Sequence, residues 1–171
     1  MATQTPLTDD EISRLRSLLK IEDIRKTRLL YSQYMDHQNI DGLADLFTEQ
    51  ALCEFGPYGE WRGRETIRSN YKDVFSGDSA KLFHSMHNSN NHWVELTSDA
   101  HAVGRSYLID VVTSTPKEDN PILWFGVYDE EYELVSDRWL ISRCSLQFLW
   151  PERHVSEDFT PEFPAGRTSA V

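Results

Sequence analysis

Residues 81–112 read KLFHSMHNSNNHWVELTSDAHAVGRSYLIDVV and mark the point where the chain changes from helical to extended patterns. From Lys81 onward long β-type segments follow one another, with turn signals at residues 97–99, 116–121 and 136–137. These signals predict about four consecutive strands joined by hairpins. This run of strands is the main evidence for the fold class.

The N-terminal part of the chain favours helix. Thr8 and Glu11 have the spacing of a capping box, in which each residue satisfies a free backbone group of the other. Apolar residues then recur at helical spacing as far as about Met35, which predicts one long helix or two abutting ones. Residues 39–42 are typical of a turn that ends this region.

Short elements lie between the long helix and the strands. Within residues 43–47, the spacing of Leu43, Leu46 and Phe47 indicates a short amphipathic helix. Residues 51–55 favour a strand, residues 56–59 a tight turn, and residues 60–62 the hairpin return. Apolar residues within 67–75 space out a further helix.

Three helices followed by hairpin-connected strands predict an α+β fold. We expect one curved antiparallel sheet with the helices packed against its concave face and a pocket between them. Residues 1–150 form a single domain in this interpretation. Residues 151–171 contain three prolines and little periodicity, so we expect an extended tail that is frayed or laid over a neighbour.

The composition excludes several classes of protein. The 171 residues include 17 Lys and Arg against 28 Asp and Glu, a net charge of −11, which would repel nucleic acid and anionic membrane surfaces. The longest apolar run, residues 122–128, is far shorter than the roughly 18 residues of a membrane span. Residues 1–10 lack the basic flank and apolar core of a signal peptide, so we expect a cytoplasmic protein.

Cysteine and histidine are the first candidates for chemistry. Cys53 and Cys144 lie far apart without ligand spacing, so we interpret both as small buried hydrophobic residues. His84, His87 and His92 cluster, but positions 84 and 87 of a strand face opposite ways, which argues against a metal site. Ordinary surface or core histidines remain an alternative. Residues 85–92 are rich in polar side chains, which favours a strand that lines water or a ligand cavity.

Asp36 is unusual because a carboxylate near a helix C-terminus is disfavoured by the helix dipole. It is either an ordinary solvated residue or a residue that holds one nitrogen of a histidine and leaves the other free as a general base. Tyr31 lies about 140° around the helix from Asp36, so both reach one cavity only if it wraps the helix end.

Other residues are weaker candidates. Arg105 and Arg143 lie in predicted strands, where they either bind an anionic group or point outward into solvent. No serine has the glycine-flanked setting of a nucleophile, and no glycine-rich phosphate loop precedes a helix. Aromatic side chains supply core or pocket surface: Trp61, Trp93, Tyr107, Trp124, Tyr128 and Phe148.

The order and spacing of these residues resemble the SnoaL-like branch of the nuclear transport factor two-like superfamily, over about residues 20–150. Its members fold as a cone-shaped α+β half-barrel. The resemblance rests on the following residues: Tyr31, Asp36, residues 46–49 with Ala51, residues 63–65, 85–87, 104–105 and 107–108, Gly126, Tyr128, Tyr132 and Trp139.

The family resemblance implies a catalytic set. Bile-acid 7α-dehydratase, scytalone dehydratase and hexachlorocyclohexane dehydrochlorinase are lyases of this superfamily that need no cofactor and no metal. By similarity to them, His87 is the general base and Asp36 orients it. Tyr31, with Tyr34 or His92, would donate a hydrogen bond to the leaving hydroxyl or a developing oxyanion.

The resemblance also implies the class of substrate. We expect a hydrophobic, hydroxylated aromatic or polycyclic molecule that contacts Tyr107, Trp124, Phe148 and Arg105. Phe148 stands where the bile-acid dehydratase has an arginine. Elimination of water or halide and cleavage of a C–C bond with release of a small aldehyde both remain open.

Two other functions fit the same resemblance. Related isomerases and polyketide cyclases use the aspartate alone as base, and the small subunit of ring-hydroxylating dioxygenases shares the fold without catalysis. The non-catalytic alternative predicts that Asp36 and His87 lie too far apart to form a hydrogen bond. By similarity to the family we expect a homo-oligomer, a dimer or trimer, formed through the convex face of the sheet.

Overall fold

The computed structural model describes residues 6–76, 82–113, 116, 118 and 121–163. The elements are α1 (Asp9–Asp36), α2 (Ile40–Ala44), β1 (Phe47–Glu54), the 3-10 turn η1 (Gly56–Tyr58), β2 (Glu60–Arg62), α3 (Arg64–Val74), β3 (Ser85–Leu96), β4 (His101–Val112), β5 (Ile122–Val135) and β6 (Arg138–Trp150). Within these residues no helix is both long enough and apolar enough to cross a membrane.

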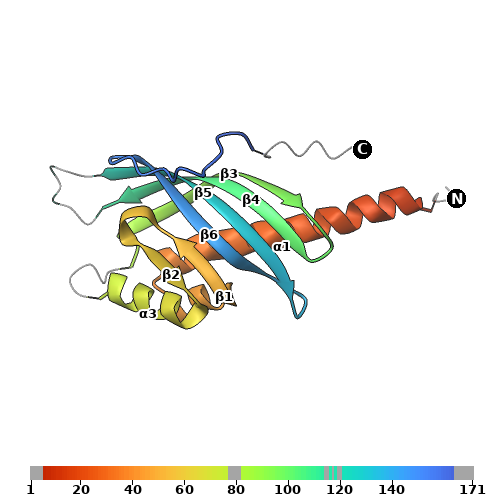
Figure 1. Ribbon diagram of the computed structural model, residues 1–171, viewed down its shortest axis with the longest axis horizontal. Helices are drawn as coiled ribbons and strands as arrows, with labels where there is room; N and C mark the ends of the chain where they lie inside the picture. Colours follow the sequence, from red (N-terminus) through yellow and green to blue (C-terminus); the bar gives the residue numbers. More distant parts are fainter. Residues whose placement is uncertain (1–5, 77–81, 114–115, 117, 119–120, 164–171) are drawn as a thin grey trace, which may run out of the picture.

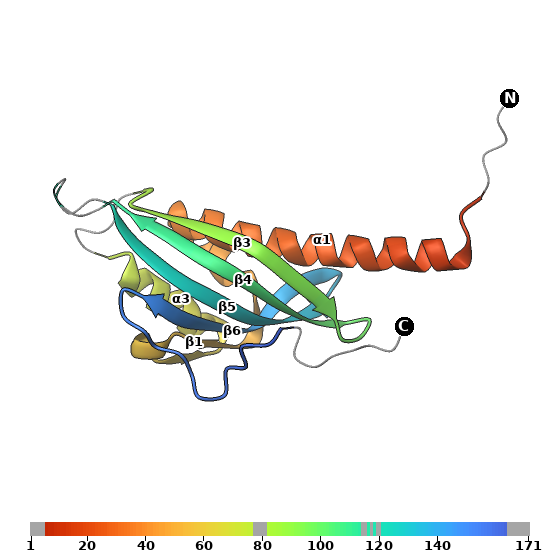
Figure 2. The same ribbon diagram turned by 90° about the horizontal axis from the view of Figure 1, so that it is seen from above.

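One curved sheet of six strands carries the fold, and the helices pack against it (Figures 1 and 2). The strand order is β2-β1-β6-β5-β4-β3, and β3 to β6 form the predicted series of antiparallel hairpins. The turns at residues 97–99 and 136–137 are confirmed. The turn predicted at residues 116–121 falls partly outside the described residues. The predicted α+β class is confirmed.

The sheet is mixed, so the expectation of a fully antiparallel sheet was wrong for one pair of strands. β1 and β6 pair in parallel, with Cys53 opposite Cys144. A hairpin forces antiparallel pairing only between strands that are neighbours in the chain. No short connection joins β1 to β6, so the curve of the whole sheet sets their relative direction.

The short helix predicted at residues 43–47 was also wrong in part. The helix ends at Ala44, and Phe47 is already the first residue of β1. The carbonyl of Leu46 accepts a hydrogen bond of 2.8 Å from the backbone N–H of Ile141 in β6. Pairing with a strand distant in sequence therefore overrides the local helical spacing.

The long helix is confirmed as a single element that begins at the predicted capping box. Glu11 N–H donates to the hydroxyl of Thr8 at 3.3 Å, and the N–H of Thr8 donates to the carboxylate of Glu11 at 2.8 Å. The N-terminal part of α1 extends beyond the sheet (Figure 2). Leu15, Leu18 and Leu19, toward this end of the helix, are exposed.

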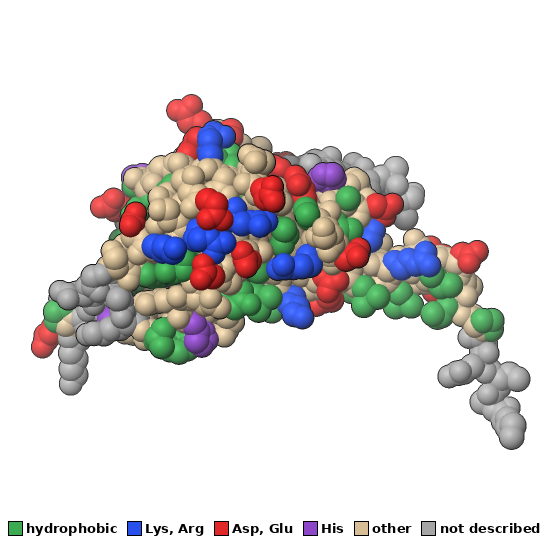
Figure 3. Space-filling view, turned by 90° about the horizontal axis from the view of Figure 1, so that it is seen from below, with side chains coloured by type: hydrophobic (Ala, Val, Ile, Leu, Met, Phe, Trp, Pro, Cys, Tyr) green, Lys and Arg blue, Asp and Glu red, His purple; other side chains and the backbone are tan. Residues whose placement is uncertain are grey.

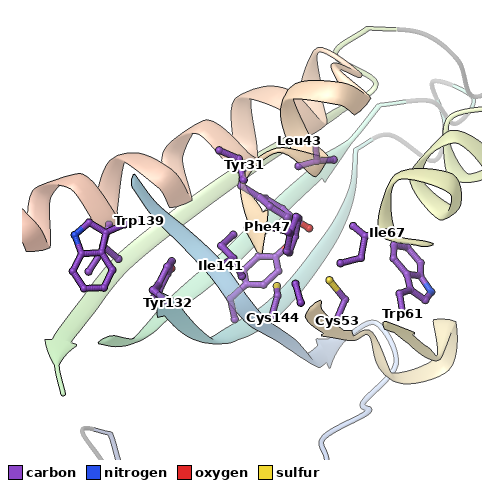
Figure 4. Close-up of a cluster of buried hydrophobic side chains, with 14 of the residues drawn as sticks. Tyr31, Leu43, Phe47, Cys53, Trp61, Ile67, Tyr132, Trp139, Ile141 and Cys144 are labelled. Atoms are coloured by element: carbon purple, nitrogen blue, oxygen red, sulfur yellow. The ribbon is translucent and has the colours of Figure 1, made fainter. Parts of the chain in front are cut away.

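The hydrophobic core lies between the helices and the inner face of the sheet (Figure 4). Tyr31 of α1 and Ile67 of α3 meet Phe47, Cys53 and other residues of the strands there. Cys53 and its strand neighbour Cys144 are free thiols buried in this core, as expected. Both lie at the centre of the cluster in Figure 4.

The tail returns along the sheet of its own chain. His154 forms an isolated β-bridge with Phe148 of β6. Further on, Phe159 and Phe163 stack on the guanidinium of Arg105 at 4.4 and 4.6 Å. Residues 151–163 therefore pack on their own sheet, and residues 164–171 lie outside the described part of the chain.

Candidate active site

The end of α1 and the edge strand β3 run side by side. Ser32 and Ser89 join their hydroxyls at 3.0 Å, and one helical turn later Asp36 meets His87. One turn of helix rises about 5.4 Å and two residues of a strand rise about 6.6 Å, so successive pairs stay matched. The N–H of Phe83 also donates to the carbonyl of Asp36 at 3.0 Å. This seam brings together two residues 51 positions apart.

His87 and Asp36 form a bidentate contact. Nδ1 of His87 lies 2.8 Å from Oδ1 of Asp36, and the backbone N–H of His87 donates to both carboxylate oxygens at 3.1 and 3.2 Å. An ionised carboxylate only accepts hydrogen bonds, so Nδ1 carries the proton and Nε2 keeps its lone pair. The pair has the geometry of an oriented general base. This distance contradicts what the non-catalytic alternative predicts.

A cavity of about 520 Å³ opens beside this pair. Tyr31, Asp36 and His87 all line it, so the cavity does wrap the helix end. Its volume suits a small organic ligand. Many of the lining residues are aromatic, among them Phe55, Trp61, Tyr71, Trp124, Tyr128 and Phe148. Trp124 and Phe148, predicted to contact substrate, therefore lie on the cavity wall.

Tyr31 is a buried phenol with a fixed partner. Its hydroxyl lies 2.7 Å from that of Tyr71 on α3. Burial raises the pKa of Tyr31 and of Tyr71 above the usual value for tyrosine, so both phenols stay protonated at neutral pH. When Tyr71 donates to Tyr31, the proton of Tyr31 is free to point into the cavity. Sequence reasoning assigned Tyr71 only to a helix face, because its apolar spacing is typical of core residues.

Two residues predicted near the base lie outside the cavity. The ring of Tyr34 packs beside Gly42 and α2. Nε2 of His92 lies 3.4 Å from the hydroxyl of Tyr132.

A bulge in β3 explains the position of His92. Strict alternation places positions 84 and 92 on one face and 87 on the other, but a bulge at Asn91 shifts the register of β3 and turns His92 inward. Burial lowers the pKa of His92 to about 4, so it is neutral at pH 7.

Tyr107 and Arg105 also lie outside the cavity, on the opposite face of β4. In this strand Leu108 and Asp110 face the cavity, so the odd-numbered residues face the other way. Tyr107 is 50% exposed. Arg105 is neither solvated nor in the pocket, because Asp129 accepts from its guanidinium at 2.7 and 2.9 Å and the tail covers it. These two predicted contacts with substrate are therefore not part of the cavity.

The expectation that His84 and His87 face opposite ways was wrong. His84 precedes β3, where Phe83 adopts a positive φ of 57°, so strand alternation does not apply to it. Both histidines line the same cavity. The Nδ1 of His84 is buried and has no hydrogen-bond partner among the described residues. His84 is therefore a further polar group for a ligand in this cavity.

Sequence reasoning missed Asp110, and it placed Ser85 only within the polar segment 85–92 without a role of its own. Asp110 of β4 is the register partner of His87, and its Oδ2 lies 3.9 Å from Nε2 of His87. The hydroxyl of Ser85 donates a short hydrogen bond to the other oxygen of Asp110. Both residues line the cavity. Polar residues within predicted strands were the available signal, but only the pairing of β3 with β4 shows that they meet.

A buried ion pair lies beneath the cavity. Nη1 of Arg28 lies 2.9 Å from Oε1 of Glu130, and both side chains are inaccessible to solvent. The Arg28 guanidinium is sandwiched between the rings of Tyr31 and Tyr128, at 3.8 and 3.9 Å from their centroids. Tyr132 donates to the second oxygen of Glu130 at 2.6 Å. This network holds the ring of Tyr31 from below.

Within the described ranges, no three histidine, cysteine, aspartate or glutamate side chains are arranged to hold a metal ion. The cavity itself presents two imidazoles and two carboxylates among aromatic rings. Such a set can accept a proton, return it and donate hydrogen bonds from its phenols.

Comparison with known proteins agrees with this fold. A scytalone dehydratase, so named provisionally, from Novosphingobium aromaticivorans has a TM-score of 0.71 at 18% identity, covering 84% of this chain and 97% of its own. An NTF2-like protein with a cystatin-like fold from the same species also has a TM-score of 0.71, at 16% identity and coverages of 87% and 94%. At these identities the two structures support the fold alone.

A third structure is closer in sequence. It is a protein from Novosphingobium aromaticivorans named provisionally as an aromatic ring hydroxylase, with 27% identity, a TM-score of 0.64 and coverages of 77% and 92%. No curated protein matches the chain. The SnoaL-like domain matches residues 16–145, which is most of the chain. This protein therefore belongs to the SnoaL-like domain family.

Proposed function

We propose that this SnoaL-like protein is a lyase that acts on a hydrophobic, hydroxylated aromatic or polycyclic small molecule. The observation that carries the proposal is the 2.8 Å contact between His87 Nδ1 and Asp36 Oδ1 at the wall of an aromatic cavity. It leaves Nε2 of His87 as a base directed toward bound substrate. The dehydratase name of one structural neighbour agrees with this class of reaction.

In a dehydration, Nε2 of His87 removes a proton from the carbon next to the one that bears the hydroxyl. The C–H electron pair becomes a C=C bond and the C–O bond breaks. The imidazolium then returns its proton to the departing oxygen, which leaves as water. Asp36 stabilises the imidazolium, and Tyr31 donates a hydrogen bond to the oxygen as it gains charge.

The same groups support a second lyase reaction. Nε2 of His87 removes the proton of a hydroxyl, the neighbouring C–C bond breaks, and a small aldehyde leaves. The imidazolium then protonates the carbanion that remains. Both reactions use only His87, Asp36 and Tyr31, so we expect turnover to survive treatment with a chelator.

The test is a mass-resolved turnover screen of the chelator-treated protein against hydroxylated aryl-propanoids, hydroxysteroids and polyketide-like phenols, with His87→Ala in parallel. General base catalysis contributes about 10²- to 10⁴-fold, so the variant should lose most activity while its circular dichroism is unchanged. His101→Ala, at an exposed position, is the matched control. Turnover retained by folded His87→Ala would refute the assignment.

Product mass also separates the alternatives. Loss of water or of an aldehyde identifies a lyase, whereas an isomerase or cyclase conserves mass. A third candidate function is the non-catalytic subunit of a ring-hydroxylating dioxygenase. The ring-hydroxylase name of one structural neighbour favours it. That candidate predicts no conversion of any compound and tight association with a larger subunit.

We further propose that the protein is a homo-oligomer. The outer face of β3 and β4 exposes large apolar side chains, among them Trp93, Tyr107 and Ile109. Exposed apolar patches of this kind are typical of protein contacts. In the face seen from below, acidic and basic side chains are interspersed, and hydrophobic side chains gather along the projecting helix (Figure 3).

A further inference from the structure

Two hydrogen-bond acceptors face each other in the cavity. Nε2 of His87 and Oδ2 of Asp110 are 3.9 Å apart, which is too long for a hydrogen bond between them. In the tautomer set by Asp36, Nε2 has a lone pair and no proton. No side chain of the described residues donates a hydrogen bond between these two atoms. A ligand that brings an O–H group fits this gap.

We propose that Asp110 is the substrate-binding carboxylate of this site and that it selects an uncharged substrate with a hydroxyl group over a carboxylate of the same shape. This inference rests on the proposed function, because it names the substrate of the same cavity. It assigns to Asp110 a role distinct from that of Asp36, which holds the base.

The position of Asp110 is set by the fold. It lies opposite His87 in the register of β3 and β4, so the two side chains leave the sheet side by side toward the cavity. Ser85, two residues before His87, donates to Oδ1 of Asp110, and Oδ2 has no hydrogen-bond donor among the residues that the structure describes. The side chain of Asp110 is 14% exposed, which is enough for contact with a ligand but not for free motion.

Charge then decides which ligands enter. Asp36 and Asp110 line the cavity, and among its described lining residues none is a lysine or an arginine. Arg28, which lies beneath the cavity, is already paired with Glu130. A bound carboxylate would face two like charges without a described counter-ion, whereas a hydroxyl would donate a charge-assisted hydrogen bond to Asp110.

The experiment measures binding, so it does not depend on the reaction. The probes are 2-naphthylmethanol, 2-naphthoate and 2-methylnaphthalene, which share one ring system, and the signal is quenching of tryptophan fluorescence, since Trp61 and Trp124 line the cavity. The unaltered protein should bind the alcohol at least about 10-fold more tightly than the carboxylate, because one hydrogen bond to a charged group is worth about that factor.

Asp110→Asn keeps the shape and removes the charge. We expect the alcohol to bind about 3- to 10-fold more weakly, the carboxylate about 10-fold more tightly, and the methyl compound unchanged. Asp137→Asn removes the same charge from an exposed turn and should change none of the three affinities. The comparison of probes on unaltered protein tests the selection even if Asp110→Asn does not fold.

The outcomes separate this inference from the proposed function. Equal binding of alcohol and carboxylate, or the same preference in Asp110→Asn, would overturn the role of Asp110 and leave the lyase proposal intact. Failure of all three probes to bind would overturn this inference, since the cavity would then not accept the naphthyl ring, and the turnover screen would still decide the lyase proposal.

Discussion

His87 and Asp36 are joined twice, through the imidazole Nδ1 at 2.8 Å and through the backbone N–H of His87 at 3.1 Å. The backbone contact fixes where the carboxylate lies, and the side-chain contact fixes which nitrogen carries the proton. A base that is held in one tautomer before substrate arrives needs no rearrangement during the reaction.

Asp36→Asn tests this relationship directly. An amide N–H can donate to Nδ1, which favours the tautomer with its proton on Nε2, the wrong nitrogen for a base. We expect kcat to fall by about 10²- to 10⁴-fold with little change in folding. Nitrogen NMR of His87 should report the change of tautomer. Asp23→Asn, at an exposed position of the same helix, is the control, and equal activity of the two variants would contradict the assigned role.

Tyr31→Phe removes the phenol that we expect to donate to substrate. Tyr71 then loses its partner in a buried site, so the free energy of unfolding should fall by about 1–3 kcal/mol. Activity should fall by about 10- to 1000-fold. Tyr71→Phe breaks the same hydrogen bond and should cost similar stability, but it leaves the hydroxyl of Tyr31 in place. Urea unfolding and kcat together distinguish the roles, and equal losses of activity in both variants would refute a direct role for Tyr31.

Arg28→Met should be the most destabilising of these changes. It leaves Glu130 as an uncompensated charge in the core, at a cost of about 3–5 kcal/mol. Arg28→Met combined with Glu130→Gln removes both charges and should recover part of that loss. Denaturant midpoints of the unaltered protein and the two variants test this, and a double variant less stable than Arg28→Met would show that the charge of Glu130 is not the cause.

The lowered pKa of His92 should make the free energy of unfolding depend on pH. This pKa is about 4 in the folded protein, because burial disfavours the charged ring, against about 6.5 in an unfolded chain. Between these values the unfolded state binds the proton more readily, so stability falls as pH drops from 6.5 to 4 and this contribution does not change further below 4. The full effect is about 3 kcal/mol.

His92→Gln should remove this contribution, so its urea midpoint should fall less between pH 7 and pH 4.5 than that of the unaltered protein. His101→Gln, at an exposed position, should follow the unaltered protein. A variant at position 92 with an unchanged pH profile would show that His92 is not the titrating group.

Ile109→Asp tests the proposed oligomer. Ile109 lies among exposed apolar side chains on the outer face of the sheet, and a buried unpaired carboxylate would disfavour contact between copies. Light scattering after size exclusion should give a multiple of the chain mass for the unaltered protein and a monomer for the variant. Val135→Asp, at the exposed end of β5, should leave the assembly intact. A monomeric unaltered protein would contradict the proposal.

The sequence by itself determined the fold class and predicted three candidate catalytic residues. Helical spacing, turn residues and alternating strands are local patterns, and they were sufficient to predict the long helix and the hairpins. Tyr31, Asp36 and His87 were found by resemblance to a family, and Asp36 also by its unfavourable place at a helix C-terminus. These three lie together in the structure.

Only the tertiary structure decided which other side chains share the cavity. One inserted residue in β3 reversed the face of His92, and the register of β4 directed Asp110 inward but Arg105 and Tyr107 outward. The parallel pairing of β1 with β6 and the contact of Tyr71 with Tyr31 join residues distant in sequence. Local propensity contains no information on such pairs, because they depend on the curvature and register of the whole sheet.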